Sequence, residues 1–333
     1  MKRQHTIRPD FVVANQREIN GDPGSRNTLG AIIPVNALQF SANVNSHLAI
    51  NDHDDFTFFG GTDDHPFSIS FWTNLSSAGA DSNVRYLFAK WGNEYYAYYK
   101  QTTGEFKFVI YDTTADGGGA AAVTFTAPTV LSKKIFEDSF DTWAHITVVY
   151  TPETGDDAND ETIQFYKNGS PWGAAQGTSD NDYDASQNST AKLVIGALST
   201  SHTATARPIG MTSNWLFFKH DGAANDAGVT RGTSPLTAAD VLELYNGGFP
   251  MANYMKSAKG ADLVAYWKLD EDVSTATQIT DYSPQSNHMS IIGSAVTTDT
   301  TSGLEINTKK TLTWAQRRMT IPGLSSLRTN PQK

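Results

Sequence analysis

The chain has 333 residues, of which 39% are hydrophobic and 11% aromatic. It is long and apolar enough to bury a large core, which excludes a disordered protein. It has no cysteine, which excludes disulfide bonds, thiolate metal sites and cysteine nucleophiles. No apolar run approaches the ~18 residues of a membrane-spanning helix, and the basic start lacks the apolar region of a secretory signal. We therefore expect neither feature.

The net charge of −10 is unevenly distributed. Residues 1–34 carry +2 and residues 304–333 carry +5, which leaves −17 for residues 35–303. Such an acidic body disfavours binding to nucleic acid. Both ends are polar and punctuated by Pro and Gly, so we expect extended arms that dock on an acidic partner; the alternative is a pair of solubilising tails. The basic residues expected to dock are Arg3, Arg8, Arg17, Arg317 and Arg318.

The first half of the acidic body reads as a series of short strands. Apolar and polar residues alternate over 35–60, which predicts two strands, and a central strand follows at 67–72. Three more strands are expected in close succession, at about 85–91, 94–100 and 106–112.

Tyrosines occupy both faces of the expected strand at 94–100. Tyr96 and Tyr98 share one face, and Tyr95 and Tyr99 share the other. Together with Trp91 in the preceding turn, Tyr96 and Tyr98 are candidates for a platform on which sugar rings stack. The alternative is that these rings belong to the core, because alternation in a half-buried strand always buries one face.

The second half continues the pattern. Residues 143–150 and 161–168 predict an antiparallel pair, and Asn168-Gly169 is the dipeptide most typical of a tight hairpin turn. Further strands are expected at 192–198, 213–219 and 263–271. One short helix is predicted where Thr237 can cap the first turn with Asp240 at the third helical position. The chain is thus predicted to be an all-β antiparallel sandwich over 35–303 with terminal arms at 1–34 and 304–333.

Six segments resemble, in order, the motifs of the laminin-G-like branch of the concanavalin A-like lectin/glucanase superfamily, near the pentraxins. They are Leu38–Phe40 with His47–Ile50, Phe67–Trp72, Trp143–Tyr150, Phe165–Gly169, Leu193–Gly196 and Leu236–Asn246. The resemblance implies a jelly roll of two antiparallel sheets, often with a calcium site and a rim that binds sugar or protein. One segment departs from the pattern: Leu263–Asp270 resembles a strand that often opens such domains, yet here it comes late.

Calcium is the cofactor that this resemblance suggests, and three acidic clusters supply oxygen ligands. The favoured cluster is Asp180, Asp182 and Asp184, whose carboxylates alternate along one loop. The others are Asp52, Asp54 and Asp55, and Asp156, Asp157 and Asp160. The alternative for all three is a solvated acidic loop.

Catalysis is not expected. A glycosidase needs two carboxylates that face one cleft, and Glu94 and Glu105 flank their strands singly. The motifs of serine hydrolases, zinc proteases and phosphate-binding loops are absent from the sequence. A glycoside hydrolase is therefore the least favoured reading.

Modules of the resembled family normally act outside cells, whereas this chain lacks cysteine and an evident export signal. A bacteriophage or other virus protein reconciles these facts, because it is made in the host cytoplasm and meets the outside after lysis. We therefore expect a non-enzymatic, oligomeric virion structural protein, either a capsid decoration or a tail-fibre adhesin, with arms on other virion proteins and a lectin-like sandwich facing a surface glycan. The alternative is a carbohydrate-binding module of a cell-surface or secreted protein.

Overall fold

The computed structural model describes 37–40, 46–58, 64–75, 84–92, 94–100, 103–111, 122–127, 143–152, 161–177, 186–199, 207–245, 259–269, 271, 276–293 and 297–299. The chain divides into two compact units, Met1–Ile32 and Ile33–Lys333, and every described residue lies in the second. The predicted arms and their five arginines lie outside the described residues, so the domain boundaries stay a prediction.

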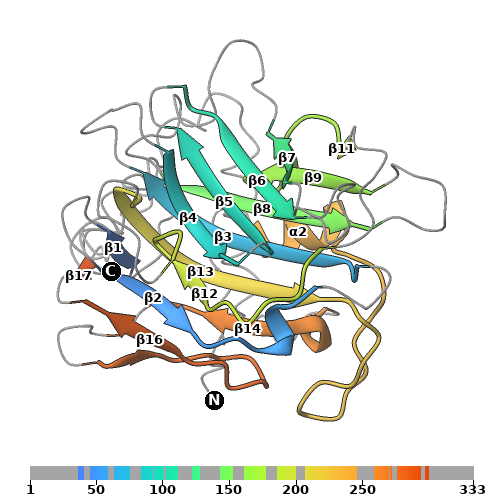
Figure 1. Ribbon diagram of the computed structural model, residues 1–333. Coiled ribbons are helices and arrows are strands. Elements are labelled where there is room, and N and C mark those ends of the chain that lie inside the picture. The colour runs from blue at the N-terminus through green and yellow to red at the C-terminus, as the bar shows by residue number, and fades with distance from the viewer. Residues whose placement is uncertain are drawn as a thin grey trace, which may run out of the picture. The chain divides into compact units, whose positions relative to one another are not determined.

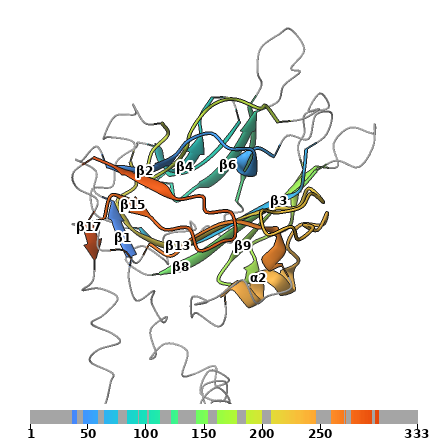
Figure 2. The same cartoon turned by 90° about the horizontal axis from the view of Figure 1, so that it is seen from below.

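Two antiparallel sheets form a sandwich (Figures 1 and 2). The first contains β10, β9, β8, β3, β13, β1 and β17 in this order, with β11 paired to β9 and β14 paired to β13. Its strands are β1 (Ala37–Phe40), β3 (Phe67–Leu75), β8 (Ala144–Thr151), β9 (Thr162–Lys167), β10 (Ser170–Pro171), β11 (Gln176–Gly177), β13 (Gly210–Lys219), β14 (Leu263–Trp267) and β17 (Thr297–Asp299). The predicted fold class, a jelly-roll-like β-sandwich, is confirmed.

The second sheet has the order β15, β16, β2, β12, β4, β5, β6, β7. Its strands are β2 (His47–Ile50), β4 (Val84–Lys90), β5 (Tyr95–Lys100), β6 (Phe106–Tyr111), β7 (Ala122–Thr126), β12 (Leu193–Ile195), β15 (Gln278–Ile279) and β16 (Met289–Ile292). Two short 3-10 turns, η1 (Asp54–Phe56) and η6 (Gly260–Asp262), complete the elements.

The core lies between the sheets and is rich in aromatic rings. Phe67, Ile69 and Phe71 on β3 point inward and are fully buried, as the alternation of that strand predicts. Phe71 stacks on Trp215 of β13 with 4.2 Å between ring centroids. Aromatic pairs of this kind add about 0.5–1.5 kcal/mol each beyond the area that they bury.

Two local predictions are confirmed by the backbone. Asn168 and Gly169 have φ values of 51° and 77°, the left-handed pair that a tight hairpin turn between β9 and β10 requires. The helix α2 (Ala238–Tyr245) begins after Thr237, whose hydroxyl accepts a hydrogen bond from the backbone N–H of Asp240 at 3.3 Å. The Asp240 carboxylate in turn accepts one from the backbone N–H of Thr237 at 2.8 Å, which closes the predicted capping box.

The helix α2 covers the outer face of the first sheet (Figure 2). Val241 and Leu244 are buried in a second apolar cluster with Leu216, Phe218 and other residues of that sheet. The opposite, outer face of the second sheet has no described helix over it. This outer face of the second sheet is therefore the candidate binding surface.

Among the described residues, none of the helices has the length and apolarity to cross a membrane.

The late segment that departs from the family pattern lies beside the first strand of the sandwich. β14 pairs with β13 along Trp215–Phe218, and β1 pairs with β13 along 210–212. β3 takes the other edge of β13, so β14 and β1 follow one another along the same edge. The still later strands β16 and β17 pair with the early strands β2 and β1.

Candidate functional site

Five aromatic rings form a strip on the outer face of the second sheet, and we call them the aromatic strip. They are Tyr86 of β4, Trp91 of the β4–β5 turn, Tyr96 and Tyr98 of β5, and Tyr111 of β6. Trp91 is 40% exposed and the four tyrosines are partly exposed. The strip combines accessible ring faces with hydroxyl groups, which is the combination that recognition of a sugar requires.

The rings follow one another at short, regular separations. The centroid of Trp91 lies 5.5 Å from that of Tyr96, which lies 6.0 Å from that of Tyr98. Tyr111 flanks the first pair, with its centroid 6.1 Å from Trp91 and 6.0 Å from Tyr96. Tyr86 flanks the second pair, at 5.6 Å from Tyr96 and 5.9 Å from Tyr98. The surface is therefore continuous over more than one ring.

The alternation of inward and outward side chains along β5, together with a bulge in β4, places these rings on the outer face. Along β5, Tyr95, Ala97 and Tyr99 are buried in the core, so Tyr96 and Tyr98 must face outward. On β4 the register shifts between Tyr86 and Phe88, and both Leu87 and Phe88 enter the core. This bulge lets β4 continue in the sheet while Tyr86 stays opposite Tyr98 on the outside.

A glycine holds Trp91 in place. Gly92 has a φ of 147°, and a Cβ there would lie 2.8 Å from both the Cβ of Ala191 and the Oγ of Ser189. The turn that carries Trp91 therefore packs closely against the segment at 189–191, and only glycine fits the approach.

The hydroxyls of Tyr86, Tyr96 and Tyr98 remain protonated over a wide pH range. Burial, followed by the neighbouring Tyr111, raises the pKa of both Tyr86 and Tyr96. Burial is also the first cause that raises the pKa of Tyr98, followed by Tyr86 and Glu105. A neutral phenol both donates and accepts a hydrogen bond, so the strip can pair with the hydroxyl groups of a ligand.

Sequence reasoning found three of the five rings, and the structure brings Trp91, Tyr96 and Tyr98 together as one surface. It missed Tyr86 and Tyr111. The pairing of β5 with β6, which brings Tyr111 beside Tyr96, cannot be read from the sequence of either strand alone. The place of Tyr86 depends on the bulge, for which the sequence of β4 carries no clear signal.

The acidic residues at 52–55 were an alternative calcium cluster, and the carboxylates of Asp52 and Asp55 already have cationic partners. The Asp52 carboxylate lies 2.8 Å from the Lys90 ammonium, which is itself buried against Glu94. The Asp55 carboxylate lies 2.9 Å from the Arg231 guanidinium. Lysine and arginine thus take the positions that a calcium ion would need, so this cluster does not fit calcium.

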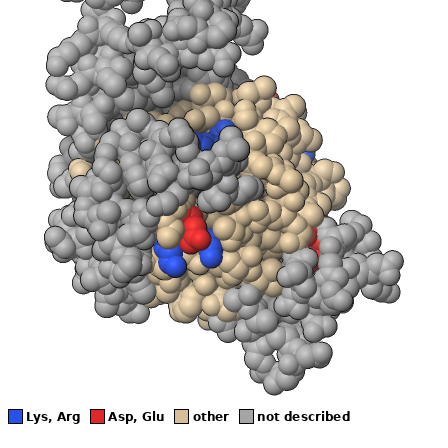
Figure 3. All heavy atoms as spheres, turned by 90° about the horizontal axis from the view of Figure 1, so that it is seen from above, with Lys and Arg blue, Asp and Glu red and all other residues tan. Residues whose placement is uncertain are grey.

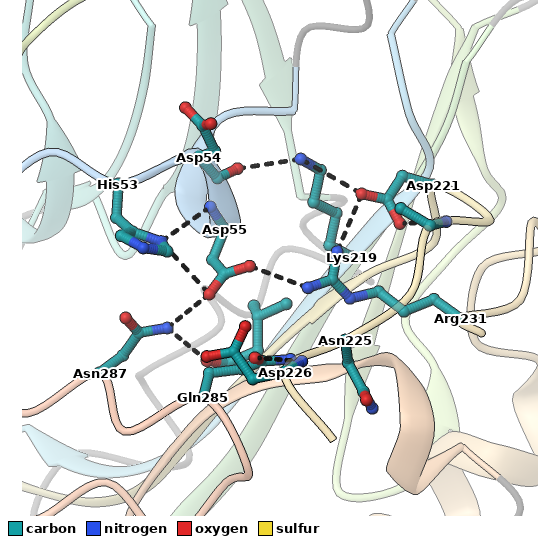
Figure 4. Close-up of polar contacts among 12 residues, drawn as sticks. His53, Asp54, Asp55, Lys219, Asp221, Asn225, Asp226, Arg231, Gln285 and Asn287 are labelled. Atoms are coloured by element: carbon teal, nitrogen blue, oxygen red, sulfur yellow. Dashed lines mark hydrogen bonds and ion pairs between the residues drawn. The ribbon is translucent and has the colours of Figure 1, made fainter. Parts of the chain in front are cut away.

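Figure 4 shows the second of these networks, which links three distant parts of the chain. Arg231 pairs with Asp55 and also with Asp221, each at 2.9 Å. Asn287 donates its side-chain N–H to the other oxygen of Asp55 at 2.8 Å. Lys219 lies 3.4 Å from Asp221 and donates to the backbone carbonyl of Asp54. This network links the segments around Asp55, Arg231 and Asn287.

The favoured calcium cluster, Asp180, Asp182 and Asp184, lies outside the described residues, as do Asp156, Asp157 and Asp160. In the described part of the chain, His, Asp and Glu side chains do not gather in a group of three that could hold a metal ion. Calcium binding by the 180–184 loop therefore stays a prediction, which a comparison of thermal stability with calcium and with a chelator would test.

The candidate carboxylates for hydrolysis do not face a common cleft. Glu94 is 1% exposed, and its carboxylate accepts hydrogen bonds from Lys90 and from Ser189. Glu105 lies at the start of β6 and accepts a hydrogen bond from Thr103 at 3.2 Å.

Figure 3 shows one side of the molecule, on which the described charged side chains are few and an acidic one lies between two basic ones.

Residues 42–207 match the profile of the concanavalin A-like lectin/glucanases superfamily. The match covers just under half of the chain, and this part of the chain is therefore similar to that superfamily, as its motifs indicate. No curated protein matches the chain in sequence.

Several solved structures are similar in fold. One is a protein from Bacteroides ovatus described as a candidate carbohydrate binding protein (15% identity, 80% of this chain and 60% of that one, TM-score 0.42). Another is the binding domain of Paraclostridial Mosquitocidal Protein 1 (14% identity, 63% and 43%, TM-score 0.42). A third is domain 4 of an extracellular arabinanase from Geobacillus stearothermophilus in complex with arabinotriose (13% identity, 59% and 72%, TM-score 0.31). The chain thus spans less than two thirds of the length of the first two.

Proposed function

We propose that this protein is a non-catalytic, lectin-like module that binds carbohydrate on the aromatic strip. The observation that carries the proposal is the exposed face of Trp91 beside tyrosines whose hydroxyls stay neutral. The C–H faces of a sugar stack on such rings, and its hydroxyl groups pair with donors and acceptors at the edge. A binding role also agrees with the family of the domain, which includes many binding modules.

Trp91→Ala tests this proposal. We expect the variant to lose about tenfold in affinity for the glycans that the wild-type chain binds, because a stacking partner at the exposed end of the strip is removed. A glycan array identifies the ligands, and isothermal titration calorimetry with the best of them measures the affinity.

The chain offers a matched control. Tyr282 is 40% exposed, as Trp91 is, but lies after β15 away from the strip and under the Lys268 ammonium. Tyr282→Ala should bind the same glycans as the wild type, and Trp91→Phe should retain most of the affinity. Equal affinity in the Trp91→Ala and Tyr282→Ala variants would refute the proposed site.

The setting that we propose for this module is a virus particle, in which the basic ends anchor the chain to other virion proteins. The support is the charge distribution, with +2 and +5 at the ends against −17 between them, and the absence of cysteine. A cell-surface or secreted carbohydrate-binding protein explains the aromatic strip equally well, and the two settings differ in the role of the ends.

Deletion of residues 1–34 and 304–333 separates these settings. In the virion setting, the truncated chain should keep its melting temperature and glycan binding but be absent from purified particles, because its anchors are gone. Full-length chain expressed in the same cells provides the reference for incorporation. Normal incorporation of the truncated chain would contradict the anchoring role.

A further inference from the structure

Two lysines stand at one end of the aromatic strip. Lys107 of β6 is directly opposite Tyr98 of β5 in the sheet register. Lys100 follows Tyr98 by two positions on β5 and therefore faces the same side of the sheet. Both lysine side chains are partly exposed. Tyr98 thus has one lysine two positions along its own strand and another directly across from it on β6.

The opposite end of the strip differs in character. Trp91, Tyr96 and Tyr111 present rings and hydroxyls. On the neighbouring strand β7, the outward residue Thr124 is also uncharged. The register of β12 with β4, continued by one residue, places the exposed Lys192 across from Trp91. A ligand that lies along the strip therefore meets one end with rings and a single lysine, and another end with two lysines.

The local charge at the basic end is positive even though the chain as a whole is acidic. Glu105 is the described carboxylate nearest in sequence to this end, and it is close enough to influence the pKa of Tyr98. Lys100, Lys107 and Glu105, the described charged residues considered at this end, together carry a net charge of about +1. In a chain with net charge −10, such a local excess beside a stacking surface selects for an anionic group on the ligand.

We infer that the aromatic strip takes an acidic oligosaccharide, with the sugar rings on Trp91 and the tyrosines and a carboxylate or sulfate group held by Lys100 and Lys107. This inference rests on the proposed function and names its ligand class. Ring centroids at successive separations of 5.5 and 6.0 Å extend the surface from Trp91 to Tyr98. The ligand is therefore a chain of sugars and not a single one, with its charge placed at the Tyr98 end.

The experiment compares ligands that differ only in charge, using the full-length chain. One pair consists of oligogalacturonides with free carboxylates and the same oligomers with methyl-esterified carboxylates. A second pair consists of heparin oligosaccharides and their desulfated forms, which distinguishes sulfate from carboxylate. We expect at least one acidic ligand to bind about tenfold more tightly than its neutral counterpart, and this advantage to shrink as salt is added.

The double substitution Lys100→Gln and Lys107→Gln should remove that advantage and leave binding of the neutral partner unchanged. Lys167→Gln, which removes a partly exposed lysine on β9 of the first sheet, is the control and should behave as the wild type. Equal affinity for acidic and neutral partners, or an unchanged acidic preference in the double variant, would overturn the inference. Neutral binding that still depends on Trp91 would then leave the proposed function standing, whereas loss of all sugar binding would remove both.

Discussion

Arg231→Met should lower the free energy of unfolding by about 3–5 kcal/mol, because it leaves buried carboxylates without their cation. Arg231 and Asp55 have side chains that are 6% and 9% exposed, and Arg231 also neutralises Asp221. Removal of one partner of such a pair costs more than the pair itself contributes, since the remaining charge stays desolvated. Urea unfolding of both proteins at pH 7 measures the difference.

The control for this experiment is Lys259→Met. Lys259 lies 3.8 Å from Asp262 and is 20% exposed, so its ion pair is longer and more solvated. We expect this change to cost less than about 1 kcal/mol. A similar, small cost for both substitutions would show that the Arg231 network does not hold the three segments together.

Stability should fall as the pH is lowered from about 6.5, because two histidines are buried in the neutral form. Burial lowers the pKa of His145 from 6.5 to about 3. Burial, followed by the nearby Arg207 guanidinium, lowers the pKa of His47 to about 4. The unfolded chain takes up these protons at a higher pH than the folded chain does, so acid favours unfolding. The stabilisation is fully present above pH 6.5 and is lost as the pH falls towards 3 to 4.

His145 is expected to account for up to about 5 kcal/mol of this loss, at about 1.4 kcal/mol per pKa unit. Its ring is 1% exposed and lies 2.7 Å from the Ser70 hydroxyl. His145→Gln cannot take up a proton, so its free energy of unfolding should depend less on pH between 6.5 and 4 than that of the wild type. Chemical unfolding at several pH values measures both slopes. Parallel slopes in the two proteins would contradict the assignment to His145.

The sequence predicted the parts of the fold whose signals are local. The alternation along β5 placed Tyr96 and Tyr98 outside and Tyr95 and Tyr99 inside, and the structure agrees. Thr237 with Asp240 located the start of α2, because a capping box lies within four consecutive residues.

The features that the sequence did not reveal depend on contacts between residues that are far apart in the sequence. Asp55 and Arg231 are 176 residues apart, and Asp55 and Asn287 are 232 residues apart. No local pattern indicates such partners, so Asp52 and Asp55 looked like ligands for calcium although lysine and arginine already neutralise them. Tyr86 and Tyr111 joined the aromatic strip only once the register of β4, β5 and β6 was known.

The pairing of the last strands with the first has a consequence for biosynthesis. β2 and β1 leave the ribosome early, yet their partners β16 and β17 follow more than 200 residues later. Until then the edges of these early strands expose unpaired backbone groups, and contacts of such long sequence separation form slowly. We therefore expect nascent chains that stop before β16 to depend on chaperones, whereas the completed polypeptide closes its own edges.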